Sequence, residues 1–103
     1  MEEVGLDLFV EFFLACKMKD LQVIADKQNN AISVKEYISF NDYQYYSTVD
    51  LNLNEPYTRV FMNMFTYYVI NNIEINFSFN SLFEFVKNAY EMFTGFDYIN
   101  KDK

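Results

Sequence analysis

The chain has 103 residues, of which 51% are hydrophobic and 22% charged, and its formal net charge is −7. It contains 12 Phe and 9 Tyr but no His, no Trp, a single Cys and a single Arg. Histidine-based catalytic triads and Cys- or His-ligated zinc sites are therefore excluded. The acidity and the lone Arg also disfavour phosphate clamping, direct nucleic-acid binding and attraction to an anionic membrane.

Residues 4–27 are predicted to form the first helix, because apolar residues recur there at close to a 3.6-residue period. The residues that define this stripe are Leu6, Phe9, Val10, Phe13, Cys16, Leu21 and Ile24. Acidic residues lead the segment and lysines follow it, which suits the helix macrodipole. Cys16 lies in this stripe and is expected to be a small buried hydrophobe.

Residues 31–53 are predicted to form a β-hairpin. Apolar and polar residues alternate on both sides of Asn41-Asp42, and both of these residue types tolerate the conformations of a tight turn. The competing interpretation is a helix that starts at Ser33, since Ser33 and Glu36 have the spacing of a capping box. The hairpin is favoured because the two-residue period covers more of the segment.

Residues 55–71 are predicted to form the second helix. Asn54 is a suitable N-cap, Pro56 falls in the first turn, and Asn71-Asn72 ends the segment. An uninterrupted helical stripe supports this assignment, formed by Tyr57, Val60, Phe61, Met64, Phe65 and Tyr68.

Residues 73–79 alternate strictly between apolar and polar side chains, which predicts a strand with one buried face. A last helix is predicted over 82–94, opened by a Ser81–Glu84 capping box and closed by Gly95. Across the whole chain we expect eight phenylalanines on core-facing stripes: Phe9, Phe13, Phe61, Phe65, Phe77, Phe79, Phe85 and Phe93.

These elements give the order α-β-β-α-β-α and an α+β fold, in which a small, mainly antiparallel three-stranded sheet packs against three helices. The alternative, if the hairpin is wrong, is a mostly helical bundle. We expect a single globular domain over 1–103 with loose ends at about 1–3 and 100–103.

Catalysis and metal binding are not expected. Asp50, Asn52 and Asn54 resemble the start of a calcium loop, but Glu55 stands where that loop needs Gly and Phe61 where it needs Glu. The three residues are better explained as the solvent face of a strand that runs into an N-cap. No pair of carboxylates lies in a context that indicates a raised pKa, so we expect no enzyme, no cofactor and no metal.

Three acidic residues, Glu3, Asp7 and Glu11, are spaced i, i+4 and i+8. On a helix they form one row with roughly 6 Å between neighbours, similar to the spacing of phosphates along a nucleic acid. The row predicts either a nucleic-acid mimic that fills a basic groove or simply a solvated polar face.

Four tyrosines surround the hairpin turn, Tyr37, Tyr43, Tyr45 and Tyr46, and Tyr67 lies on the outer side of the second helix. Tyrosine is enriched at protein interfaces, so these residues are candidate partner-binding residues. Alternation along the strand places Tyr45 and Tyr46 on opposite faces. Cross-strand aromatic pairing that only stabilises the sheet is an equally good explanation.

The leading hypothesis is a small acidic protein that binds and inhibits or neutralises a partner protein with a basic surface, as an immunity protein or an anti-defence factor of a mobile element does. The alternatives are a self-associating adaptor or structural protein, such as a homodimer, and a nucleic-acid mimic. The acidic start of the chain, Met1-Glu2-Glu3, predicts no signal peptide and a cytoplasmic location. AT-rich coding is an alternative explanation for part of the aromatic excess.

Overall fold

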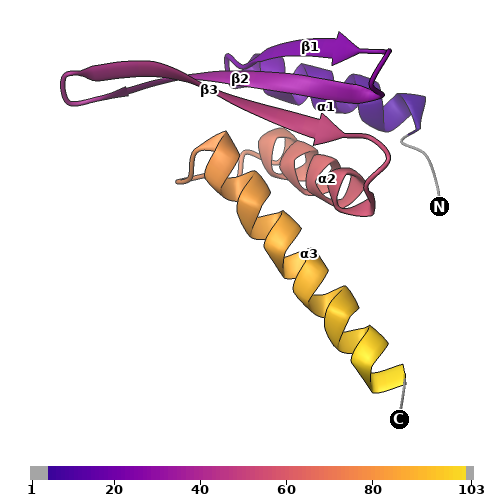
Figure 1. Ribbon diagram of the computed structural model, residues 1–103. Coiled ribbons are helices and arrows are strands. Elements are labelled where there is room, and N and C mark those ends of the chain that lie inside the picture. The colour runs from indigo at the N-terminus through magenta and orange to yellow at the C-terminus, as the bar shows by residue number, and fades with distance from the viewer. Residues whose placement is uncertain (1–4, 102–103) are drawn as a thin grey trace.

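The computed structural model describes residues 5–101 of the chain, and the side chains of residues 5–93. The chain forms an α+β fold in which three helices accompany one three-stranded antiparallel sheet, and the helical-bundle alternative is wrong (Figure 1). The strands lie in the order β1-β2-β3. The elements are α1 (Leu6–Met18), β1 (Gln22–Asp26), β2 (Ala31–Phe40), β3 (Tyr43–Asn52), α2 (Pro56–Ile70) and α3 (Phe79–Lys101).

The first helix is shorter than predicted, because α1 ends at Met18 and residues 22–26 form the edge strand β1. Asp20 adopts a φ of 58°, and the N–H of Leu21 donates to the carbonyl of Cys16 over 2.9 Å, which closes the helix end. The spacing of Leu21 and Ile24 fits a helix only by coincidence. In β1, Ile24 is exposed while Val23 packs against the core.

The hairpin prediction is confirmed with its turn in the expected place. β2 and β3 pair continuously from Ala31↔Asn52 to Phe40↔Tyr43, so only Asn41 and Asp42 lie between the strands. Asn41 has a φ of 55°, a left-handed conformation that Asn tolerates better than most residues.

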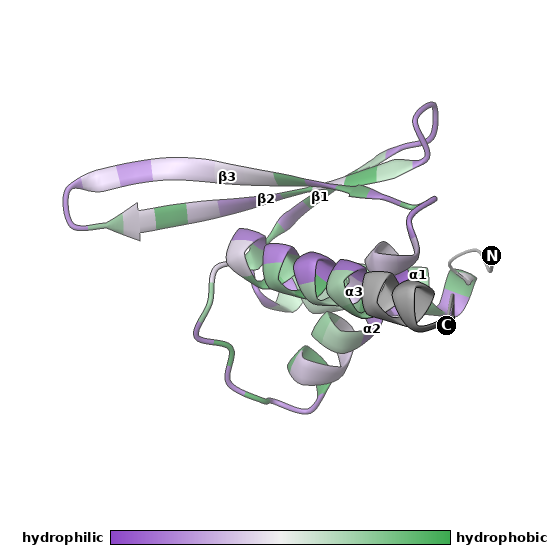
Figure 2. Cartoon of the chain, turned by 60° about the horizontal axis from the view of Figure 1, so that its bottom comes forward, coloured by the Kyte–Doolittle hydropathy of each residue, from purple (hydrophilic) through white to green (hydrophobic). Residues whose placement is uncertain are grey.

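The strand predicted over 73–79 is absent from the described part of the chain, so the element order is α-β-β-β-α-α. The third strand of the sheet is β1 instead, which takes the place beside β2. Residues 71–78 are the connection between α2 and α3, which Figure 2 shows as a long loop. Its alternation places Ile75 against the core but leaves Phe77 exposed.

The prediction that α3 spans 82–94 is also wrong at both ends. The helix begins at Phe79 because Ser78, rather than Ser81, is the capping residue: its hydroxyl accepts the N–H of Ser81 at 3.1 Å. The helix then continues through Gly95 to Lys101. A single Gly costs a helix only about 1 kcal/mol, which is not enough to end it.

The second helix agrees with its prediction over Pro56–Ile70, with Pro56 in the first turn and Asn71 directly after the last. The N-cap position is Glu55, however, and not Asn54. The side-chain oxygen of Asn54 instead accepts a hydrogen bond from Nδ2 of Asn30 at 2.8 Å, which joins the two ends of the β2–β3 pair.

The core lies between the helices and one face of the sheet. At its centre Phe61 packs edge-on against Phe79, with ring centroids 5.0 Å apart, and Phe65 meets Phe79 at 5.2 Å. Of the phenylalanines predicted to face the core, these three are buried, while Phe9 and Phe13 are half-buried. The prediction is wrong for three others, which are exposed in the described structure: Phe77, Phe85 and Phe93.

Candidate protein-binding surfaces

The β2–β3 hairpin extends well beyond the rest of the sheet. β1 pairs with β2 only as far as Gln22↔Lys35, so residues 36–47 form a two-stranded projection that we call the arm. Figure 1 shows the arm passing beyond the helices that cover the rest of the sheet. A two-stranded hairpin is marginally stable by itself in water. The arm is therefore the part of the sheet that would gain most from contact with another molecule.

One face of the arm continues the core face of the sheet. Upstream of the arm, this face carries buried pairs such as Ile32↔Leu51 and Val34↔Val49. The same side-chain row then passes beyond the helices, and hydropathy alternates along β2 out to the turn (Figure 2). In the arm it is formed by Ile38, Phe40, Tyr43 and Tyr45, and the three aromatic members are more than half exposed.

The opposite face of the arm carries Tyr37 and Tyr46, which are directly paired across the strands. Their ring centroids lie 5.3 Å apart, and Nζ of Lys35 lies 5.3 Å from the centre of the Tyr46 ring. This arrangement is the cross-strand aromatic contact that stabilises a sheet, extended by a cation–π contact. Both tyrosines are nevertheless still more than half exposed, so the contact leaves most of their surface available. The predicted placement of Tyr45 and Tyr46 on opposite faces is confirmed.

Tyr67 does not belong to the arm. It lies on α2, 6.3 Å from the ring of Tyr68, and it lines a hollow of about 610 Å³ that also involves α1. Glu11 lines the same hollow. Of the predicted binding residues, the structure thus places four tyrosines on the arm, and Glu11 and Tyr67 at the hollow.

The acidic row is only partly described, because Glu3 lies outside the described residues. Asp7 and Glu11 are exposed on α1, one turn apart as the spacing requires. Glu11 also lies at the edge of the hollow beside α2. That these carboxylates together bind a basic partner stays a prediction.

The sequence pattern does not single out Phe40 or Ile38 as members of a binding surface. Phe40 was assigned only to the alternating pattern of β2, yet its position next to the turn already places it farthest from the core. The signal that reveals Phe40 is its position beside the turn, at the end of a ten-residue strand that is farthest from the core.

The base of the arm is tied to α3 by Glu36. The N–H of Phe79, the first residue of α3, donates to Oε1 of Glu36 over 3.0 Å. A carboxylate at this position satisfies a free backbone donor and complements the positive end of the helix dipole. Glu36 therefore links the base of the arm to the first residue of α3.

Cys16 and the acidic residues are the groups to consider for reactivity or metal binding. Burial raises the pKa of the Cys16 thiol to about 12, so this sulfur stays protonated and unreactive at neutral pH. Among the described residues, no three His, Cys, Asp or Glu side chains gather as metal ligands would. Asp50 and Asn52 lie on the exposed face of β3, and Oδ1 of Asp50 accepts the hydroxyl of Ser33 at 2.6 Å.

Comparison with known proteins finds no matching protein family, no matching curated protein and no matching solved structure. In the described part of the chain, every helix is too short or too polar to cross a membrane.

Proposed function

We propose that this protein is a non-enzymatic binding protein that inhibits or neutralises a partner protein, and that the arm is its principal contact surface. The observation that carries the proposal is the projection of the arm beyond the core with five exposed aromatic residues. These are Tyr37, Phe40, Tyr43, Tyr45 and Tyr46.

The chemistry of the arm supports a protein as the partner. Aromatic side chains bury a large area at low entropic cost and dominate the binding energy of many interfaces. Contiguous exposed apolar surface is typical of interaction sites. A net charge of −7 would attract a basic partner and accelerate the encounter, and the aromatic residues would then hold the complex. A toxin or a host defence protein with a basic surface fits this description.

The proposal is tested by recovering and then reconstituting the complex. The tagged protein is used to capture partners from its native host, in parallel with the variant Phe40→Ser/Tyr43→Ser/Tyr45→Ser and the control Phe85→Ser. Phe85 is an equally exposed aromatic residue on α3, away from the arm. Any recovered partner is then purified, and its affinity and its activity are measured with and without this protein.

We expect wild type and Phe85→Ser to bind the partner with equal affinity, and the arm variant to lose at least 100-fold, because removal of several interface hot spots costs about 2 kcal/mol or more each. We expect the partner's own activity to fall when the complex forms. Equal affinity of the arm variant would refute the role of the arm. A bound partner that keeps full activity would refute inhibition.

A second candidate function is self-association through the outer edge of β3. This edge is unpaired in the described residues, and the ten-residue strand contains no Lys, Pro or bulge of the kind that protects edge strands. Two copies joined edge to edge would form a continuous sheet. Light scattering after size exclusion decides this point, since a monomeric mass at about 100 µM would exclude a dimer with a Kd of about 1 µM, or about −8.2 kcal/mol of binding free energy.

A further inference from the structure

The helix α3 starts in the core and continues beyond it. The buried residues of its described part are Phe79, Leu82, Phe83 and Val86. Among the α3 residues with described side chains, none after Val86 is buried, and Figure 1 shows the helix continuing past α2. Residues 87–101 thus form a helical segment of about 15 residues, a length that is only marginally stable in water by itself. This outer part of α3 would gain stability from a packing partner.

A stripe of apolar residues runs along the uncovered side of α3. Phe85 is 71% exposed and Met92 is 69% exposed, and half-buried Ala89 lies between them. The sequence continues the same three-and-four spacing in both directions. The six positions of the stripe are Leu82, Phe85, Ala89, Met92, Phe96 and Ile99. Apolar residues at this spacing are the pattern of a helix that packs lengthwise against another helix.

The charges of α3 lie away from this stripe. At 3.6 residues per turn, Glu84, Lys87 and Glu91 fall on the opposite side of the helix. The stripe therefore carries no charge that would select a basic or an acidic partner. A second copy of this chain, which has the same net charge of −7, can approach the stripe without placing like charges in contact.

The stripe is complementary to itself when a second helix runs in the opposite direction. Three pairs of positions are symmetric about the midpoint between residues 90 and 91: Leu82 with Ile99, Phe85 with Phe96, and Ala89 with Met92. A twofold axis at this midpoint would bring the two members of every pair together. The small Ala89 would then leave room for the flexible Met92.

A parallel pair of helices would fit less well. It would place Ala89 opposite Ala89 and leave a gap in the middle of the contact. It would also bring two bodies of net charge −7 to the same end of the pair. Antiparallel helices separate the two bodies along a helix of 23 residues, which is about 35 Å long.

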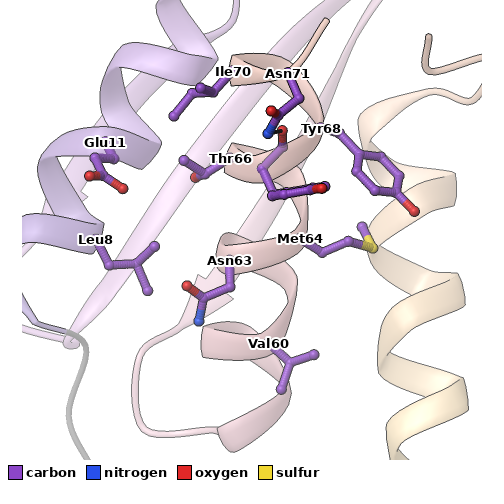
Figure 3. A pocket seen from close by; sticks show the side chains of 10 residues that line it. Leu8, Glu11, Val60, Asn63, Met64, Thr66, Tyr68, Ile70 and Asn71 are labelled. Atoms are coloured by element: carbon purple, nitrogen blue, oxygen red, sulfur yellow. Dashed lines mark hydrogen bonds between the residues drawn. The ribbon is translucent and has the colours of Figure 1, made fainter. Parts of the chain in front are cut away.

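The first turns of α3 have room beside them for the end of a second helix. A groove of about 560 Å³ lies between α2, the loop 71–78 and the start of α3. Met64 and Tyr68 line it and point from α2 toward α3 (Figure 3). Leu82 and Phe85 line it from α3. The groove is therefore apolar at the place where an antiparallel helix would end.

We propose that α3 pairs in antiparallel orientation with α3 of a second copy of this chain, through the stripe that contains Phe85, Ala89 and Met92. The end of each helix would lie against the groove of the other copy. This pairing uses no residue of the arm or of β3. It therefore goes beyond the proposed function, and it is distinct from association through the edge of β3.

The mass in solution gives the first test. Sedimentation of the full chain over a dilution series should give a dimer with a Kd of about 10 µM or tighter, so that most of the protein is dimeric at about 100 µM. A monomer at that concentration would overturn the proposal. The arm variant Phe40→Ser/Tyr43→Ser/Tyr45→Ser should dimerise as wild type does, whether or not the arm binds a partner.

A charge placed in the stripe gives the second test. Ala89→Glu keeps a good helix former but should weaken the dimer at least tenfold, because it buries an unpaired carboxylate in the contact. Asn80→Glu makes the same charge change on the opposite, exposed side of α3 and should stay within twofold of wild type. Amide exchange of residues 87–101 should rise in Ala89→Glu while the core keeps its protection, which separates loss of the partner from unfolding. A dimer that survives Ala89→Glu would refute the α3 contact and favour the β3 edge.

Disulfide cross-linking gives the direction of the helices. Ala89→Cys and Met92→Cys are prepared separately in a Cys16→Ala background and then mixed under oxidising conditions. Antiparallel pairing brings position 89 of one copy to position 92 of the other, so the mixture should form linked dimers at least tenfold faster than either variant alone. If each variant linked to itself as fast as to the other, the antiparallel arrangement would be wrong.

Discussion

The N–H of Phe79 donates a hydrogen bond of 3.0 Å to the side chain of Glu36, 43 residues earlier in the chain, so that a carboxylate on the sheet caps the helix α3. We expect Glu36→Ala to lower the free energy of unfolding by about 1–2 kcal/mol, because the helix end loses its acceptor and a favourable charge. Glu36→Gln keeps an acceptor and should lose only about half as much. Urea denaturation followed by circular dichroism measures both.

Glu74→Ala is the control for this prediction, since Glu74 is an exposed carboxylate in the loop before α3. It should change the free energy of unfolding by less than about 0.5 kcal/mol. If the control and Glu36→Ala cost the same, the contact between Glu36 and Phe79 would contribute nothing specific.

The exposed aromatic side chains of the arm should contribute little to the stability of the protein. Phe40 is exposed near the turn, whereas Phe61 is fully buried at the centre of the core. We therefore expect Phe61→Ala to cost about 3–5 kcal/mol of unfolding free energy and Phe40→Ala less than about 0.5 kcal/mol. Thermal or urea denaturation of the two variants tests the contrast. A large loss in Phe40→Ala would mean that the arm serves the fold rather than a partner.

The sequence was sufficient for the elements whose patterns are local. The hairpin was found because alternation and the Asn41-Asp42 turn agree, and α2 was found because its stripe has no gap. The element order was wrong where two patterns were ambiguous, at residues 22–26 and 73–79. A five-residue strand that follows a helix has too few residues to show its own period. Which short segment pairs with β2 is decided by packing, which the sequence pattern does not contain.

Of the two candidate surfaces, the arm could be predicted from the sequence and the hollow could not. The exposed tyrosines of the arm follow from the hairpin, because they lie next to the turn at the far end of two ten-residue strands. The hollow does not follow from any local pattern, since its lining comes from both α1 and α2 and depends on how they pack. The exposure of Phe85 was missed for a related reason. Its stripe on α3 would be buried only if another element covered that side.

Asn41 supports the turn of the arm through its backbone conformation. Its φ of 55° is strained for most residues but accessible to Asn and Gly. We expect Asn41→Ala to cost about 1 kcal/mol, Asn41→Gly to be close to neutral, and the neighbouring Asp42→Ala to lie within about 0.5 kcal/mol of wild type. Denaturation curves measure the three variants. Equal effects of Ala and Gly at position 41 would contradict the left-handed conformation.

Cys16 should be almost inert in the folded protein. The side chain is fully buried on α1, and desolvation raises its pKa to about 12. The thiolate is the reactive form, so at pH 8 both its small population and its inaccessibility slow alkylation. We expect iodoacetamide to label the native protein at least 100 times more slowly than the protein in urea. Lys17→Cys in a Cys16→Ala background provides an exposed thiol for comparison. If native Cys16 were labelled as fast as this exposed thiol, its buried position would be contradicted.

Asp26 should make the stability of the β1–β2 connection depend on pH. The side-chain amide and the backbone N–H of Asn29, together with the N–H of Gln28, donate to its carboxylate, and these bonds hold its pKa below the usual value. Because the folded pKa is lowered, the stabilisation is present above the unfolded pKa of about 3.9 and disappears as the pH falls through the folded value. Asp26→Ala should therefore be less stable than wild type at pH 7 and equal to it near pH 2. The urea midpoints of the two proteins across this range give the measurement, and a difference that persists undiminished at pH 2 would show that the carboxylate's charge is not the cause.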